Sequence, residues 1–142
     1  MVHESATLDL MSEPFDITTN PIHLGLGARA FPLPVFDGSP EWYGRYGADV
    51  ASDGAEGRLV TLHSFDASWT VWEMHPVGEE VVLCLDGEVT LHQELDGDVA
   101  TVTLTANQAV INPAGVWHTA DVEGSATCLF VTAGMGTEHR ER

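Results

Sequence analysis

From about residue 41 onward the chain consists of short runs of alternating apolar and polar residues, and this pattern predicts β-strands. Asp86-Gly87 and Asp96-Gly97, each between two such runs, predict hairpins, because glycine tolerates the positive φ that a tight turn needs. Glu123-Gly124 predicts a further turn for the same reason. The expected strands cover residues 59–65, 69–75, 81–85, 89–95, 99–104, 109–111, 116–122 and 126–132.

Strands at this spacing, without a convincing long amphipathic helix, predict an all-β fold in which the strands form an antiparallel sandwich or barrel. Residues 1–40 show little periodicity, and five prolines favour extended or turn structure there. We therefore expect an extended N-terminal arm over residues 1–40, which wraps the core or a partner subunit. A single β-barrel domain over residues 41–142 would follow, as a chain of 142 residues favours.

The large excess of acidic over basic residues argues against some classes of function. The chain has 22 acidic and 5 basic residues and a formal net charge of -17, so nucleic acids and anionic membranes are poor partners. It has no lysine, which excludes lysine Schiff-base chemistry and the phosphate-binding lysine of a P-loop. The first residues lack the features of a signal peptide and no apolar run is long enough to span a bilayer, so we expect a cytoplasmic protein. Cys84 and Cys128, each in an apolar run, are expected to be buried free thiols.

Two short segments concentrate the candidate chemistry. The first is Glu73-x-His75 followed by four residues and Glu80, and the second is Pro113-x-Gly115-x-x-His118. Imidazole nitrogen and carboxylate oxygen together suit a divalent metal such as iron, manganese, zinc or nickel. Because side chains alternate along a strand, Glu73 and His75 project from one face. A hairpin after His75 would bring Glu80 beside it, with Glu79 pointing the other way.

The remaining histidines and tryptophans are weaker candidates. His63 either lines the barrel or faces out, and His92 lies on a face that looks solvated. Trp72 and Trp117 are expected to fill apolar space, and a partner subunit could bury Trp117. Three further histidines lie in terminal or loop segments, namely His3, His23 and His139. The closing residues 134–140 either cover the barrel or extend into solvent.

The spacing of the two segments resembles the two motifs of the cupin superfamily, over about residues 58 to 133. His75, Glu80 and Gly87 match the second half of the first motif, and Pro113-x-Gly115-x-x-His118 matches the second motif. Four positions depart from the motifs: Ser68 and Asn107 stand where each motif opens with glycine, Glu73 replaces a histidine, and Val122 replaces the closing asparagine. The resemblance implies a double-stranded β-helix, also called a jelly-roll barrel, and a homodimer.

The resemblance also implies a metal held by three histidines and one glutamate. Here the ligands would be Glu73, His75, Glu80 and His118, or the last three with Glu73 left as a catalytic acid or base. A second carboxylate would favour harder cations such as Mn²⁺. Burial near another carboxylate should raise the pKa of Glu73.

Two functional hypotheses follow from the resemblance. The first is a metal-dependent enzyme that acts on a small polar or carboxylated molecule, as an oxygenase, isomerase or decarboxylase. The alternative is a barrel that binds or senses a metal or small ligand without turnover. A site that has lost its metal would leave only a structural dimer. No residue pattern in the chain selects one reaction.

Overall fold

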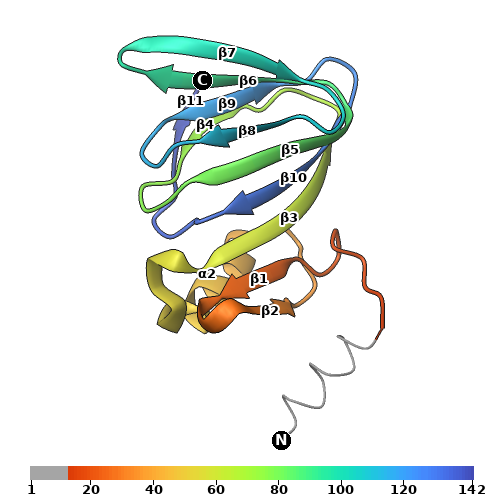
Figure 1. Ribbon diagram of the computed structural model, residues 1–142, viewed down its shortest axis with the longest axis vertical. Coiled ribbons are helices and arrows are strands. Elements are labelled where there is room, and N and C mark those ends of the chain that lie inside the picture. Colours follow the sequence, from red (N-terminus) through yellow and green to blue (C-terminus); the bar gives the residue numbers. More distant parts are fainter. Residues whose placement is uncertain (1–12) are drawn as a thin grey trace, which may run out of the picture.

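Two antiparallel sheets face one another in the computed structural model, which describes residues 13–142 (Figure 1). The six-stranded sheet has the order β2-β1-β3-β10-β5-β8. Its strands are β1 (Ile22–Gly25), β2 (Arg29–Pro32), β3 (Arg58–Phe65), β5 (Glu80–Gly87), β8 (Ala109–Asn112) and β10 (Ala126–Thr132). The five-stranded sheet has the order β11-β4-β9-β6-β7. Its strands are β4 (Val71–Met74), β6 (Val89–Leu95), β7 (Asp98–Leu104), β9 (His118–Asp121) and β11 (Glu138–Glu141).

From β3 onward the chain crosses repeatedly from one sheet to the other, and only β6 and β7 follow each other within a sheet. This is the connectivity of a double-stranded β-helix, so the predicted all-β fold is confirmed. All eight predicted strands are present. Two of them are shorter than predicted, because β4 covers only Val71–Met74 and β9 only His118–Asp121.

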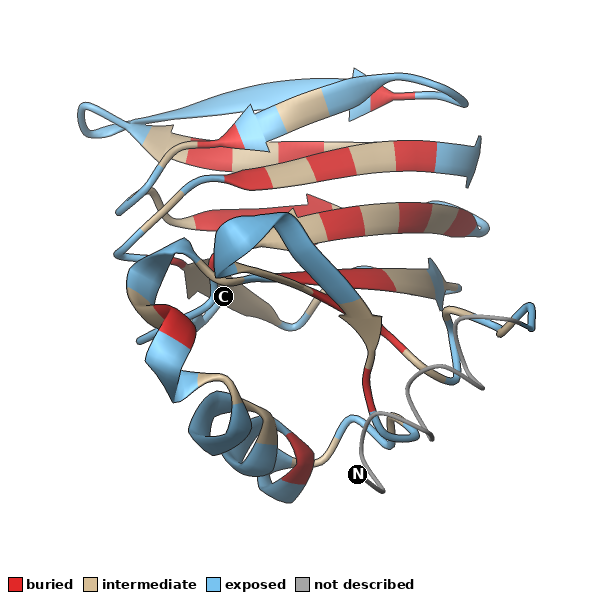
Figure 2. Ribbon diagram, turned by 60° about the horizontal axis from the view of Figure 1, so that its bottom comes forward, coloured by how far each residue is buried: buried red, intermediate tan, exposed pale blue. Residues whose placement is uncertain are grey.

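The alternation of apolar residues predicted from the sequence appears as alternating burial along the strands (Figure 2). The inward side chains form one core between the sheets, and both cysteines are buried in it as free thiols. Its buried members are Val82, Cys84, Val89, Leu91, Leu104, Ala120, Val122, Ala126, Cys128 and Phe130.

The two Asp-Gly turns have different outcomes. Asp96-Gly97 forms the predicted hairpin, since Leu95 pairs with Asp98 across β6 and β7 and both turn residues have positive φ. Asp86-Gly87 does not form a hairpin, because β5 and β6 belong to different sheets. Gly87 instead lies at a corner between the sheets, with a φ of 75°. A Cβ atom on Gly87 would lie 2.0 Å from the carbonyl oxygen of Ser125, so the corner requires glycine.

Residues ahead of β3 contain more regular structure than the sequence pattern indicated. The hairpin of β1 and β2 joins the sheet beside β3, with a short 3₁₀ turn η1 (Leu26–Ala28) between them. An α-helix, α2 (Pro40–Asp49), and a second 3₁₀ segment, η2 (Ala51–Glu56), then occupy residues for which we expected β-type runs. The helix start follows from local chemistry, since the Ser39 side chain accepts a hydrogen bond from the Trp42 backbone N–H and proline occupies the first turn.

A network of buried polar side chains connects β1 to α2 and η2. His23 lies on β1 and is fully buried, so its expected place in a loop was wrong. Its Nε2 contacts an Asp53 carboxylate oxygen at 2.7 Å, and its Nδ1 lies 2.7 Å from the Tyr46 hydroxyl. Arg29 also contacts Asp53, at 3.3 Å. His3 lies outside the described residues. No helix in the part of the chain that the structure describes is long and apolar enough to cross a membrane.

The Gly87 corner generates a stability prediction. We expect Gly87→Ala to lower the free energy of unfolding by about 2 to 4 kcal/mol, because the new methyl group meets backbone atoms at a positive φ. Gly97→Ala is the matched control: its φ is also positive, at 83°, but the space around it is open. That variant should lose only about 1 kcal/mol. Urea denaturation of both variants measures the difference, and equal losses would contradict the steric account.

Candidate metal centre

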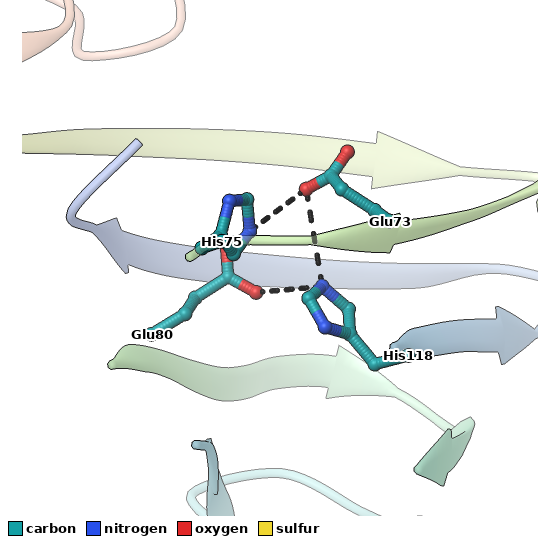
Figure 3. A group of neighbouring side chains, drawn as sticks. All are labelled: Glu73, His75, Glu80 and His118. Carbon is teal, nitrogen blue, oxygen red and sulfur yellow. Dashed lines mark ion pairs between the residues drawn. The ribbon is translucent and has the colours of Figure 1, made fainter. Parts of the chain in front are cut away.

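Two imidazoles and two carboxylates converge between the sheets (Figure 3). Glu73 lies on β4, His75 directly after it, Glu80 at the start of β5 and His118 at the start of β9. One potential ligand atom of each residue lies within 4.8 Å of the others. The four residues selected from the sequence are therefore neighbours in space.

Glu80 lies close to His75 because of a different strand arrangement from the one that we predicted. We expected β4 and β5 to form a hairpin, but they belong to opposite sheets. Glu80 therefore approaches His75 across the interior of the sandwich, and its Oε2 lies 3.1 Å from His75 Nε2. Glu73 and His118 are direct partners on the adjacent strands β4 and β9. The glycine turn of the second segment adds a link, since the Gly115 N–H donates to the His75 carbonyl at 2.9 Å.

Hydrogen bonds at Nδ1 orient both imidazoles. His118 Nδ1 lies 3.2 Å from the Val116 carbonyl oxygen, which can only accept, so Nδ1 carries the proton. His75 Nδ1 lies 2.8 Å from the Thr137 hydroxyl, and that hydroxyl donates its own proton to the Gly134 carbonyl. Thr137 therefore accepts from His75 Nδ1. Each imidazole consequently directs Nε2, the atom that can bind a metal once it loses its proton, toward the centre of the cluster.

Buried polar side chains hold Glu80 in the same way. Asn112 Nδ2 donates to Glu80 Oε1 at 3.0 Å, and the Thr132 hydroxyl donates to Oε2 at 2.6 Å. Gln93 in turn donates to Asn112 at 2.7 Å. These three residues were not among the site residues predicted from the sequence. The sequence could have indicated them only by one feature: each is a polar residue at an inward-facing position of an otherwise apolar strand.

A metal ion fits this arrangement. His75 Nε2 and His118 Nε2 are buried and lack a hydrogen bond of acceptable geometry, although carboxylate oxygens lie 3.0 to 3.3 Å away. A buried polar atom without a partner is costly, so such a pair requires an explanation. Ligand atoms about 2.0 to 2.2 Å from a shared metal lie roughly 3 to 4 Å from one another, which agrees with these spacings. The donor set of two imidazoles and two carboxylates suits a divalent transition metal.

Without a metal, the cluster stabilises its own charges. Burial by itself lowers the pKa of His75 and His118, but the adjacent carboxylates outweigh it and raise both to about 9. Burial raises the pKa of Glu73, yet the two imidazoles lower it well below its usual range. Our expectation of a raised Glu73 pKa was therefore wrong, because it did not include two adjacent cations. Glu80 behaves likewise, with a pKa of about 2.

The cluster borders a cavity of about 1,070 Å³. Glu73, His75 and Glu80 line it, whereas His118 does not, although its ring centroid lies 6.3 Å from that of Trp69, which does. The Glu73 side chain is 23% exposed, against 4% or less for the other three, so it is the member of the cluster most open to the cavity. Aromatic side chains form much of the wall: Tyr43, Tyr46, Phe65, Trp69 and Phe130.

The other histidines and the tryptophans named as weaker candidates lie in different environments. His63 lines the cavity and burial lowers its pKa, so the inward alternative applies. His92 is half-buried and contacts Asp121 at 2.7 Å, which shows that its face is not simply solvated. Trp72 and Trp117 are half-buried beneath the Arg140 guanidinium, at 5.2 and 4.7 Å from their ring centres.

Comparison with known proteins gives a family match. A sequence model of the family described as "Cupin domain" matches residues 60–134, just over half of the 142 residues. Comparison with curated proteins gave no match.

Several solved structures are similar in fold. A cupin superfamily protein from Desulfitobacterium hafniense DCB-2 is 24% identical, with a TM-score of 0.46, over 53% of this chain and 65% of that one. Oxalate oxidase is 14% identical, with a TM-score of 0.49, over 56% of this chain and 44% of that one. Hydroquinone 1,2-dioxygenase from Sphingomonas sp. TTNP3, with 4-hydroxybenzoate bound, is 15% identical, with a TM-score of 0.43, over 51% and 57%. The chain thus spans less than two thirds of each of these proteins.

The raised imidazole pKa values predict how metal binding depends on pH. Below pH 9 both Nε2 atoms carry protons that a metal must displace, so affinity should rise with pH and level off above about 9. At pH 7 we expect release of about two protons per metal and up to about a 100-fold change in affinity per pH unit. Titration calorimetry in buffers of different ionisation enthalpy measures the proton release. Binding without proton release would contradict ligation by these two imidazoles.

Proposed function

The chain belongs to the cupin family, and we propose that it is a metal-dependent enzyme acting on a small polar molecule. The observation that carries the proposal is the pair of buried Nε2 atoms of His75 and His118. Neither makes a hydrogen bond of acceptable geometry, and both face two carboxylates that border a large cavity. Convergent ligands beside an accessible cavity are the arrangement that metal-assisted catalysis requires.

In this proposal His75, Glu80 and His118 hold the metal, and Glu73 is the fourth ligand. Its Oε1 lies 3.0 Å from His75 Nε2 and 3.9 Å from His118 Nε2. This oxygen is therefore close to the nitrogen atoms that would bind the metal. A bound divalent metal would supply a Lewis acid, or a position for O₂ if it is redox-active. Two carboxylates balance the charge of a divalent ion and favour hard cations, so manganese and iron(II) are preferred over zinc and nickel.

Glu73 is also the residue to which we assign proton transfer. Its carboxylate lines the cavity and is the least buried group of the cluster. Because its pKa is lowered, Glu73 is ionised at neutral pH and begins the reaction as a base rather than as an acid. Its second oxygen, Oε2, lies 3.0 Å from His139 Nε2 and has a further lone pair, on which it would accept the proton.

The cavity favours an uncharged substrate over a carboxylated one. None of the five arginines lines it within the described residues 13–142, and the sequence contains no lysine. Two carboxylates already border it and balance the charge of a bound divalent metal, and no arginine or lysine side chain of the described lining is left to pair with an anionic ligand. The wall instead offers aromatic rings for stacking and hydroxyl groups for hydrogen bonds, from Thr61, Thr132 and Tyr43. We therefore propose a polar, uncharged molecule that contains a ring.

Single substitutions test the ligand assignment. We expect His75→Ala, Glu80→Ala and His118→Ala each to reduce bound metal sharply, because each removes a donor atom and leaves a buried charge without its partner. His63→Ala is the matched control, since His63 lines the same cavity but lies outside the cluster. Elemental mass spectrometry of the purified variants measures the occupancy. Undiminished metal in His75→Ala and His118→Ala would contradict the assignment.

Ligand charge tests the substrate class. Metal-loaded protein should be stabilised against heat by simple phenols and not by the corresponding benzoates, because only the benzoates bring an uncompensated negative charge. Thermal shift assays with matched pairs at one pH measure this preference. Stabilisation by benzoates alone would instead support a carboxylated substrate.

Turnover separates an enzyme from a binding barrel. An enzyme should consume some member of a panel of uncharged cyclic alcohols and phenols when loaded with metal. Consumption should fall by at least about 100-fold in Glu73→Gln, as expected for loss of a catalytic base. Product analysis by liquid chromatography and mass spectrometry provides the measurement. Ligand-induced stabilisation without consumption under any metal would favour the non-catalytic alternative.

A further inference from the structure

The last strand of the chain lies beside the metal centre. β11 lies beside β4 and pairs antiparallel with it (Figure 1). The register of the two strands places His139 directly opposite Glu73. The family match ends at residue 134, so this strand lies outside the matched region. We expected His139 in a terminal or loop segment, and the structure places it on a strand instead.

The two oxygens of Glu73 have different partners. Oε1 faces the cluster, 3.0 Å from His75 Nε2, whereas Oε2 lies 3.0 Å from His139 Nε2. His139 also lines the cavity, and its side chain is 53% exposed. An exposed ion pair of this kind contributes little to folding stability. Its effect should therefore appear in the orientation of Glu73 and not in the stability of the fold.

The same segment supports a second ligand of the cluster. Thr137, two residues before His139, accepts the hydrogen bond from His75 Nδ1. The strand end is held to the barrel, because Arg140 lies over Trp72 and Trp117 and forms an ion pair with Glu94. Arg142 donates to the Trp69 carbonyl at 2.9 Å. The position of His139 is thus fixed by contacts that do not involve the metal centre.

We propose that His139 is a positioning residue of the metal centre, which holds Glu73 so that only Oε1 faces the metal. The Nε2–H of His139 donates to Oε2 and occupies the oxygen that would otherwise be free to bind the metal as well. This deepens the proposed function and rests on it, because it assumes a metal between the four residues. Substitution of a residue that hydrogen-bonds to a metal ligand typically changes metal affinity by about 10- to 100-fold.

Metal affinity in three variants tests this role. We expect His139→Ala to weaken Mn²⁺ binding by about 10-fold, through loss of the hydrogen bond that orients Glu73. His139→Gln, which keeps an N–H donor at a similar reach, should restore most of the affinity. Glu138→Ala is the matched control, because Glu138 is exposed and adjacent on the same strand. Competition titration with a fluorescent chelator gives the affinities, and melting temperatures without metal show whether each variant folds.

A double variant separates positioning from direct ligation. If His139 acts through Glu73, then Glu73→Ala/His139→Ala should bind Mn²⁺ no more weakly than Glu73→Ala alone. A further loss in the double variant would show that His139 ligates the metal itself and would overturn the proposal. Unchanged affinity in folded His139→Ala would also overturn it while leaving the proposed function intact. Wild-type protein that binds no metal would overturn both.

Discussion

Two carboxylates and two imidazoles bring their ligand atoms within 4.8 Å of one another inside a β-sandwich, and three of the four groups are almost completely buried. Such a cluster is stable only if the donor and acceptor atoms that do not face its centre form hydrogen bonds with surrounding groups. Asn112 and Thr132 do this for Glu80, and Thr137 and the Val116 carbonyl do it for the two imidazoles. These contacts come from the six-stranded sheet and from the segments before β9 and β11, whereas Glu73 and His118 lie on the five-stranded sheet. The orientation of the cluster therefore depends on the closure of the whole barrel.

Glu73 distinguishes this chain from the usual cupin pattern. Where the first motif has a histidine, the chain has a carboxylate that faces both the cluster and the cavity. The replacement lowers the net charge of the site by one. It also removes the positive field that would attract an anionic substrate, in a cavity whose described lining contains no arginine. The proposed metal preference and the proposed uncharged substrate thus rest on the same substitution.

The sequence was sufficient for the barrel and for the four clustered residues, because both depend on local spacing. Alternation predicted the strands, and the two motifs carried the histidines and glutamates. Even the departure at Asn107 is explained by local conformation, since it adopts a φ of 73° that asparagine tolerates. The cytoplasmic location and the homodimer stay predictions.

What the sequence could not provide was the pairing of distant segments. The Asp86-Gly87 dipeptide has the same local signal as Asp96-Gly97, yet it forms a corner because β5 and β6 pair with different strands. His139 lies 66 residues from Glu73 and becomes its neighbour only through the pairing of β11 with β4. The helix α2 was missed although Ser39, Pro40 and Glu41 form a recognisable start, because the chain from about residue 41 onward was interpreted as a region of β-type runs.

Metal stoichiometry in the unaltered protein tests the central claim most directly. The protein would be purified without a chelator or a histidine tag and analysed by elemental mass spectrometry. The account predicts about one transition metal ion per chain, held tightly enough to raise the melting temperature. Protein that contains no metal, and whose melting temperature does not change on addition of Mn²⁺, Fe²⁺, Zn²⁺ or Ni²⁺, would contradict it.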